Sequence, residues 1–252
     1  MIRQVQDSDP KSSVLADVSH NREHWNAVGP GYSDKWKSLG TQVLSTAELG
    51  FINKYLAANN AEKAIDIGIG NGRILEALLK SPNLRELYGI DTAERMVEVC
   101  QERFKHDSRV KALQVANLSV EPLPFAETFD FATAIRMLKY NENWRQMIAK
   151  VTNRLRTGGI FVFSIPNKNS LGQFASHALP YHSSSRAEIT DLIKSYDLEL
   201  LEISGFAKLP HRWYRRSDKR KVTGLVLVER TFSRILGPTL FSLELFVAVR
   251  KK

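Results

Sequence analysis

The chain has 252 residues, of which 43% are hydrophobic and 25% are charged, a composition that excludes an extended disordered protein. It contains no apolar run of the roughly 18–20 residues that a membrane span needs, and its polar N-terminus is unlike a secretory signal. Because Cys100 is the single cysteine, an intramolecular disulfide is excluded, and we expect a cytoplasmic protein.

The net charge of +9 is concentrated in one segment. Residues 208–221 hold seven Lys or Arg side chains and one Asp, a surplus of six positive charges. The basic balance is therefore a local feature, and it does not by itself indicate a nucleic-acid-binding protein.

The N-terminal part divides into three stretches. Residues 1–18 read as a poorly ordered arm, and residues 21–40 contain Trp25, Tyr32 and Trp36 around a Gly-Pro-Gly turn. The apolar residues of 41–60 recur at helical spacing, which predicts an amphipathic helix. We assign residues 1–40 to an N-terminal arm and helical segment, and residues 41–252 to the main domain.

A short apolar run then carries Asp66 near its end and leads into Gly68, Gly70 and Gly72. An apolar-periodic segment follows over 72–80, so the pattern predicts a strand, a tight glycine turn and a helix. Glycine lets a ligand approach the main chain, and the helix directs its free N–H groups and positive dipole end at the turn. This unit is typical of a nucleotide-type cofactor site.

The glycine spacing argues against a nicotinamide dinucleotide. The dinucleotide fingerprint Gly-x-Gly-x-x-Gly would require glycine at position 73, which is Arg73. The carboxylate of Asp66 would also repel a pyrophosphate in the turn, whereas it suits a ligand that carries an ammonium or sulfonium cation there.

The following segments alternate strands and helices. A second apolar strand over 86–91 ends at Asp91, whose carboxylate can accept hydrogen bonds from both hydroxyls of a ribose. Further strands are predicted at 110–115, 129–135, 160–165, 198–206 and 241–249, and helices at 92–105, 142–156 and 186–196. Residues 170–185 read as a substrate-side loop or short helix, and residues 207–240 as an insertion before the last strand.

In this ordered set the sequence resembles the class I S-adenosylmethionine-dependent methyltransferases over roughly residues 60–206. The glycine turn matches the first motif of this family, and Asp91 matches the acid that binds the ribose. The run 155–159 before an apolar strand matches a further motif. The resemblance implies an α/β, doubly wound, seven-stranded Rossmann-like sheet. It places the last strand antiparallel between strands five and six, with an N-terminal helical lid over the pocket.

The resemblance also implies roles for individual residues. Gly68, Gly70 and Gly72 would let the methionine end of S-adenosylmethionine approach the backbone, and Asp66 would anchor that end directly or through water. Asp91, followed by Thr92, would hold the ribose.

At the adenine end, the resemblance implies that Asn117 accepts a hydrogen bond from the adenine amine and that Leu118 lies against the ring. The alternative is that Asn117 only caps a turn. Arg136 follows strand four at the same sheet edge and is a further candidate cofactor contact. Tyr32 is the candidate residue of the lid, unless the N-terminal aromatic residues merely pack on the domain edge.

Catalysis needs a general base only if the acceptor is a hydroxyl or a protonated amine. The candidates at the sheet edge are Tyr140, His177, Tyr181 and His182, and each could instead be a packing or surface residue. The segment after strand four supplies no set of carboxylates, so we expect no metal. It also lacks the Asp/Asn-Pro-Pro-aromatic element that amino-methylating nucleic-acid enzymes use to hold a flipped base.

We therefore expect methyl transfer to an oxygen or nitrogen of a small molecule: a sugar, a quinone-type compound, a natural product or a lipid-linked intermediate. The alternatives are a nucleic-acid methyltransferase, a nicotinamide-dependent oxidoreductase and a cofactor-binding subunit without turnover. The basic, aromatic-rich stretch 208–236 allows a cap over an anionic substrate, contact with an anionic membrane surface, RNA binding or a solvated loop.

Overall fold

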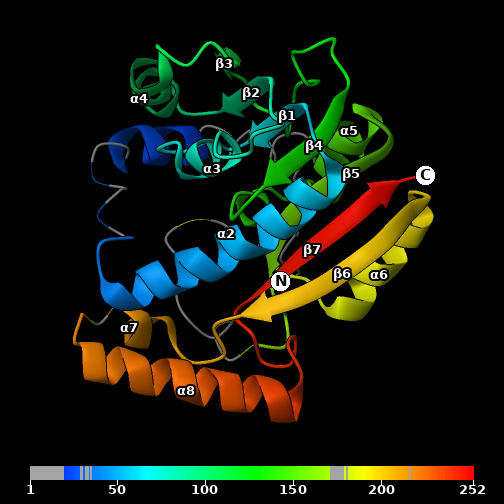
Figure 1. Cartoon of the computed structure of the whole chain (residues 1–252). Helices are drawn as coiled ribbons and strands as arrows, with labels where there is room; N and C mark the ends of the chain where they lie inside the picture. Colours follow the sequence, from blue (N-terminus) through cyan, green and yellow to red (C-terminus); the bar gives the residue numbers. More distant parts are fainter. Residues whose placement is uncertain are drawn as a thin grey trace, which may run out of the picture.

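The computed structural model describes residues 20–28, 31, 34, 36–170, 179, 181–215 and 217–252. In these residues one seven-stranded sheet has the strand order β3-β2-β1-β4-β5-β7-β6 (Figure 1). Strand β7 pairs antiparallel with both β5 and β6, whereas the pairs among β1 to β5 are parallel. This confirms the predicted doubly wound α/β fold with an antiparallel last strand. The strands are β1 (Lys63–Ile67), β2 (Glu86–Asp91), β3 (Val110–Val115), β4 (Phe129–Ala134), β5 (Leu155–Pro166), β6 (Leu198–Phe206) and β7 (Glu244–Lys251).

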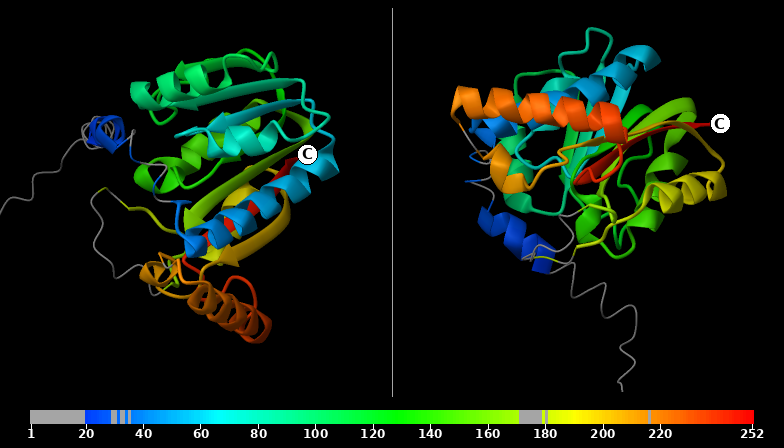
Figure 2. Two further views of the ribbon diagram at one scale, coloured as in Figure 1. Left: turned by 60° about the vertical axis from the view of Figure 1, so that its left-hand side comes forward. Right: turned by 90° about the horizontal axis from the view of Figure 1, so that it is seen from below.

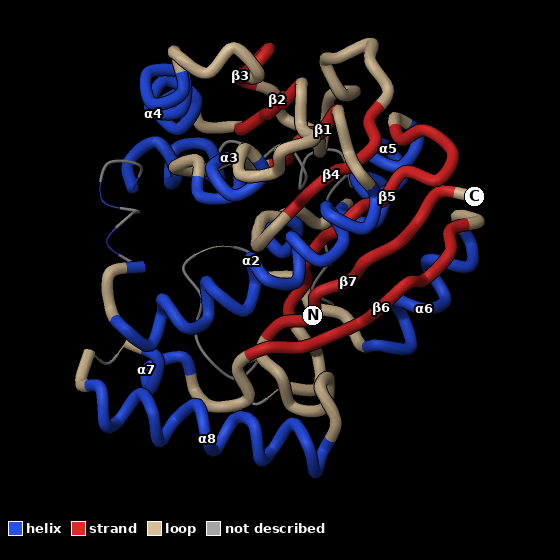
Figure 3. The backbone as a smooth tube through the Cα atoms, in the orientation of Figure 1, coloured by secondary structure: helices blue, strands red, loops and turns tan. Residues whose placement is uncertain are grey.

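Helices cover both faces of the sheet (Figure 3). The helices of the described residues are α2 (Leu39–Asn59), α3 (Arg73–Leu78), α4 (Glu94–Phe104), α5 (Trp144–Asn153), α6 (Arg186–Ser195), α7 (His211–Tyr214) and α8 (Lys219–Leu236), besides the 3₁₀ turn η2 (Leu138–Tyr140) and a helix over 20–28. Those on the faces of the sheet are α2 to α6. Alternate residues of each strand point to opposite faces. Thus Ile65 and Phe161 pack with α5 and α6, whereas Ala64 and Val162 pack with α2, α3 and α4.

Three predicted boundaries are wrong by three or more residues. The last strand begins at Glu244 rather than Phe241, because Phe241 has a φ of 58° and lies exposed in the turn before the strand. The helix predicted to reach residue 156 ends at Asn153, and β5 begins at Leu155 rather than at Ile160, because Leu155 already pairs with Phe129. The insertion 207–240 contains the helices α7 and α8. None of the described helices combines the length and apolar content needed to cross a bilayer.

Candidate functional site

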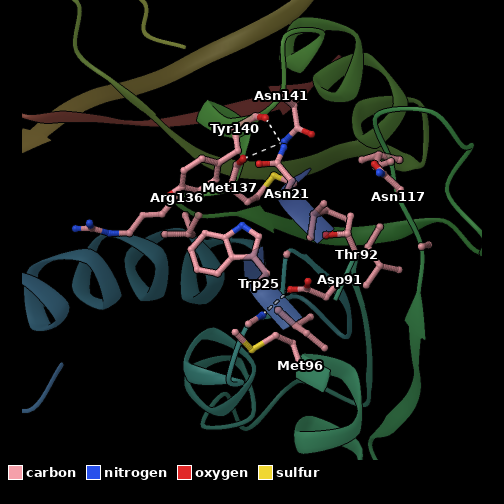
Figure 4. Close-up of a pocket in the computed structure, with 18 of the residues that line it drawn as sticks. Asn21, Trp25, Asp91, Thr92, Met96, Asn117, Arg136, Met137, Tyr140 and Asn141 are labelled. Atoms are coloured by element: carbon pink, nitrogen blue, oxygen red, sulfur yellow. Dashed lines mark hydrogen bonds between the residues drawn. The ribbon is translucent and has the colours of Figure 1, made fainter. Parts of the chain in front are cut away.

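A pocket opens at the carboxyl ends of β1, β2 and β4, and it encloses about 960 Å³ of space including its mouth (Figure 4). This is the edge at which ligands bind in open α/β sheets. Lining residues come from the glycine turn, the ends of β2, β3 and β4, and the helix over 20–28. They include Asn21, Trp25, Gly68, Gly70, Arg73, Asp91, Thr92, Met96, Asn117, Leu118, Arg136, Met137, Tyr140 and Asn141.

The glycine turn needs glycine at each of the three predicted positions. Gly68, Gly70 and Gly72 all have positive φ, between 51° and 83°, a region that strains other residues. A Cβ on Gly68 would lie 2.9 Å from the side chain of Met137, and one on Gly72 would lie 2.7 Å from Phe104. The turn therefore has no room for side chains at Gly68 and Gly72, and the backbone of Gly68 and Gly70 lines the pocket.

Asp91 closes the pocket beside this turn. Its Oδ2 accepts a hydrogen bond from the Gly70 amide at 2.9 Å, and its Oδ1 accepts one from the Ala93 amide at 2.9 Å. Each carboxylate oxygen can accept a second hydrogen bond, so the group can also receive two ligand hydroxyls. Burial raises the pKa of Asp91, and the amides of Ala93 and Gly70 oppose that shift.

Asp66 lies beneath the turn and does not line the pocket, although the next residues, Ile67 and Gly68, do. Its side chain is buried, and Oδ1 accepts a hydrogen bond from the Thr133 hydroxyl at 2.6 Å. Its Oδ2 is buried and has no hydrogen-bond partner among the described residues. Burial raises the pKa of Asp66 to about 8, and the Thr133 hydrogen bond partly opposes this. An unpartnered buried carboxylate oxygen fits a site whose ligand brings a positive charge.

A buried ion network borders the pocket beside the turn. The carboxylate of Glu48, on α2, is fully buried and accepts from Arg73 Nη2 at 2.8 Å and from Arg136 Nε at 3.0 Å. The Arg136 guanidinium also lies 3.5 Å from Glu244. The ring of Trp36 lies 4.1 Å from the Arg73 guanidinium and 5.2 Å from that of Arg136. Because both arginines line the pocket, Glu48 fixes two cations at its wall.

Asn117 and Leu118 line the pocket at the end of β3, where Figure 4 places Asn117 near Thr92. The Oδ1 atom of Asn117 accepts from the Ser119 amide at 3.0 Å and from the Ser119 hydroxyl at 2.7 Å. Both acceptor positions of this oxygen are thus used inside a turn, as the capping alternative anticipates. Because Oδ1 is engaged by Ser119, it does not fit the role of acceptor for an adenine amine, and Nδ2 is the amide atom that remains for a ligand.

The helix over 20–28 covers the mouth of the pocket. The Nδ2 of Asn21 donates to the backbone oxygen of Tyr140 at 2.7 Å, and the ring of Trp25 lies edge-on to that of Tyr140 with centroids 5.3 Å apart (Figure 4). Tyr32, the residue predicted for the lid, lies outside the described residues. In the described part of the chain, Asn21 and Trp25 are the lid residues that reach the pocket.

The four candidate bases have different positions. Tyr140 lines the pocket, and burial raises its pKa to about 12, so its hydroxyl stays protonated and can donate at neutral pH. Burial also raises the pKa of Tyr181, which with His182 lies outside the pocket wall. The His182 amide donates to the Lys139 oxygen at 2.8 Å, and its Nε2 is buried without a partner among the described residues. His177 lies outside the described residues.

The sequence reasoning missed Glu48, although the signal was present. Leu44, Ile52 and Leu56 follow one another at multiples of four along α2, and Glu48 occupies the missing step of this apolar stripe. A carboxylate on the buried face of a helix needs a partner, and two arginines provide it.

The methyltransferase domain family matches residues 65–163 of this chain, the segment that contains the glycine turn, Asp91 and strands β1 to β4. Over these residues the chain is similar to the S-adenosylmethionine-dependent methyltransferase family, whose fold it shares. This confirms the resemblance stated from the sequence, and S-adenosylmethionine, the cofactor expected, is the cofactor of that family.

Similar proteins extend the comparison. The ubiquinone biosynthesis O-methyltransferase of Methylococcus capsulatus is 28% identical over 153 residues, which are 60% of this chain and 60% of that protein. The N-methyltransferase NodS of Bradyrhizobium japonicum has a similar fold, with a TM-score of 0.63, 17% identity, and coverage of 93% of this chain and 98% of NodS. The [4+2]-cyclase SpnF also shares the fold, with a TM-score of 0.64, 13% identity, and coverage of 92% and 94%. The chain spans about half the length of the first curated relatives it matches.

Proposed function

We propose that this chain transfers the methyl group of S-adenosylmethionine to an oxygen or nitrogen atom of a small molecule. The observation that carries the proposal is the half-buried carboxylate of Asp91 at the tip of β2, hydrogen-bonded to a turn whose glycines leave the backbone without side chains. Two relatives point to the acceptor atoms by their names, because one is an O-methyltransferase and the other an N-methyltransferase.

The described residues would hold the cofactor at three places. Asp91 has two acceptor positions left for ribose hydroxyls, and Leu118 offers an apolar contact for the adenine, next to the Asn117 amide as a donor to a ring nitrogen. At the methionine end, Arg73 would supply a cation for the carboxylate, and Asp66, which lies beneath the turn, would hold the ammonium group through water.

The bound cofactor supplies an already activated sulfonium methyl group, so the protein needs to align an acceptor and exclude water. Trp25 and Tyr140 would do both at the mouth of the pocket, and orientation alone can contribute about 7–11 kcal/mol to a reaction between two bound groups. With its raised pKa, Tyr140 would orient an acceptor by donating a hydrogen bond. His182, whose Nε2 has no partner among the described residues, is the remaining candidate for accepting a proton.

The test is incubation of the purified chain with methyl-labelled S-adenosylmethionine and small-molecule fractions of cell extracts. We expect the unchanged chain to transfer the label to a product, and we expect the Asp91→Asn variant to form no labelled product. Binding of S-adenosylmethionine without transfer to any fraction would favour a subunit or enzyme of this fold with another role, as the cyclase SpnF illustrates for the fold. Calorimetric binding of NAD in its place would overturn the proposal in favour of an oxidoreductase.

A further inference from the structure

Helix α8 presents four large apolar side chains to solvent. Val228, Phe232 and Ile235 follow at spacings of four and three, so they lie on one side of the helix next to Leu227. Leu227 and Ile235 are 65% and 73% exposed, and Val228 and Phe232 are exposed as well. We call these four residues the outer face of α8. Figure 1 and the left view of Figure 2 place α8 at the lower edge of the molecule, and in the view from below it lies in front of the other elements.

The opposite side of α8 is fixed to the domain. Val222 and Leu225 are buried, and Leu225 packs in a cluster with Tyr214 and with Leu44 of α2. Glu229 turns inward as well. Its carboxylate accepts from the amides of residues 208 and 209, at 2.8 and 3.0 Å, and from the Tyr214 hydroxyl. Because these contacts hold the helix in one rotation, the outer face cannot turn inward without breaking them.

The charge exposed on α8 has a single sign. The helix carries five exposed basic residues and one acid, Glu229, which is bonded inward. The basic residues are Lys219, Arg220, Lys221, Arg230 and Arg234. Among the described residues, none of these five makes an ion pair with a carboxylate. By contrast, Lys208, part of the same basic stretch, is buried and donates to two backbone carbonyls.

The cap interpretation of this insertion finds no support in the pocket. No described residue of 207–240 lines it, so the basic residues of α8 are not placed to hold an anionic group beside the cofactor. The helix α8 instead packs through Leu225 on Leu44 of α2, and its Glu229 is bonded to Tyr214 of α7, whose backbone oxygen accepts from the Ser38 hydroxyl at 3.0 Å. What α8 binds must therefore lie outside the domain.

We propose that the outer face of α8 docks on an anionic lipid bilayer, with the helix lying in the plane of the interface. Exposed apolar residues bordered by cations are the composition that partitions to the headgroup boundary, and each nearby basic residue adds to the attraction of anionic lipid. A nucleic acid would use the cations but not the aliphatic side chains, and a second copy of this surface would bring like charges together. The bilayer satisfies both features at once. The proposal concerns binding alone, and it stands or falls independently of methyl transfer.

The test is co-sedimentation of the full chain with vesicles of phosphatidylcholine, with and without 30% phosphatidylglycerol. We expect sedimentation with the anionic vesicles and at least tenfold less with the neutral ones. The Leu227→Ser/Ile235→Ser double variant should lose at least tenfold in partition coefficient. Arg230→Glu/Arg234→Glu should lose about thirtyfold or more, because each basic residue near the surface is worth about fivefold.

Matched controls separate this surface from general effects. Lys80→Glu/Lys105→Glu changes the net charge equally at two other exposed positions, and Val120→Ser removes an exposed apolar residue elsewhere. Both controls should bind as the unchanged chain does. The proposal is overturned if the unchanged chain stays in solution with anionic vesicles, or if the controls lose as much as the α8 variants. It is equally overturned if the apolar variant retains binding, or if light scattering shows that the outer face forms a dimer and is covered.

Discussion

Replacement of Glu48 by glutamine should be the most damaging isosteric change at the pocket wall. The Glu48 side chain is fully buried, and it is hydrogen-bonded to Arg73 and Arg136, whose side chains are only 17% and 14% exposed. Glu48→Gln keeps the shape but leaves two guanidiniums in a poorly solvated site with one fewer negative charge. Removing one partner of a buried ion pair typically costs about 3–5 kcal/mol.

We expect the lower end of that range, about 3 kcal/mol, because each arginine keeps other contacts. Arg136 retains Glu244 at 3.5 Å, and Arg73 retains the Ser45 hydroxyl at 2.8 Å and the ring of Trp36. For a chain of this size, such a loss lowers the midpoint of thermal unfolding by roughly 6–12 °C.

The measurement is urea and thermal unfolding of Glu48→Gln beside Glu76→Gln, a matched change at an exposed carboxylate that also pairs with an arginine, Arg103. Exposed pairs contribute about 0–1 kcal/mol, so the control should unfold almost as the unchanged chain does. Equal stability of the two variants would refute the reasoning that Glu48 compensates two buried cations.

Three further predictions concern the turn and its surroundings. Gly68→Ala should destabilise the fold by more than Gly158→Ala and should abolish cofactor binding. Both glycines have φ near 80°, but only a Cβ at position 68 would meet Met137. Equal urea midpoints of the two variants would contradict this prediction. Because the pKa of Asp66 is about 8 folded and about 4 unfolded, the folded chain holds an extra proton between these values, so stability without cofactor should fall from pH 4 to pH 8. Asp66→Asn should reduce this dependence of the free energy of unfolding on pH, measured by denaturation at several pH values. An unchanged dependence would show that another group causes it. Trp25→Ala should weaken S-adenosylmethionine binding several-fold in calorimetry without changing the unfolding midpoint, and unaltered affinity would remove Trp25 from the lid.

The sheet could be predicted because its signals are local and periodic. The apolar runs of β1 and β2, followed by glycine and by an acid, and the apolar run of β5, preceded by two glycines, predicted these strands and the positions of Asp66 and Asp91. Positive φ at Gly68, Gly70 and Gly72 is what their spacing required. The late start of β7 was missed because the alternation continues back to Phe241 in sequence, whereas the chain turns there at a positive φ.

The site could be predicted only where a role belongs to one segment. Asp91 reaches the pocket because it ends a strand, and no other element is needed to place it. Glu48 acts through arginines 25 and 88 residues away, a pairing that only the tertiary fold creates. The orientation of the Asn117 side chain depends on its hydrogen bonds with Ser119. A sequence pattern cannot show which atom of the amide makes these bonds. Trp25 reaches the described pocket because of the rotation of the helix over 20–28, which a sequence pattern does not give, and Tyr32 lies outside the described residues.

The most direct test of the central claim is a calorimetric titration of S-adenosylmethionine into the unchanged chain and into Asp91→Asn. Hydrogen bonds to a charged group are worth about 1.5–3 kcal/mol, so the substitution should weaken binding at least tenfold while the variant remains folded by circular dichroism. Equal affinity of the two proteins would show that the carboxylate at the tip of β2 does not hold the ribose. The assignment of this pocket to the cofactor would then be wrong.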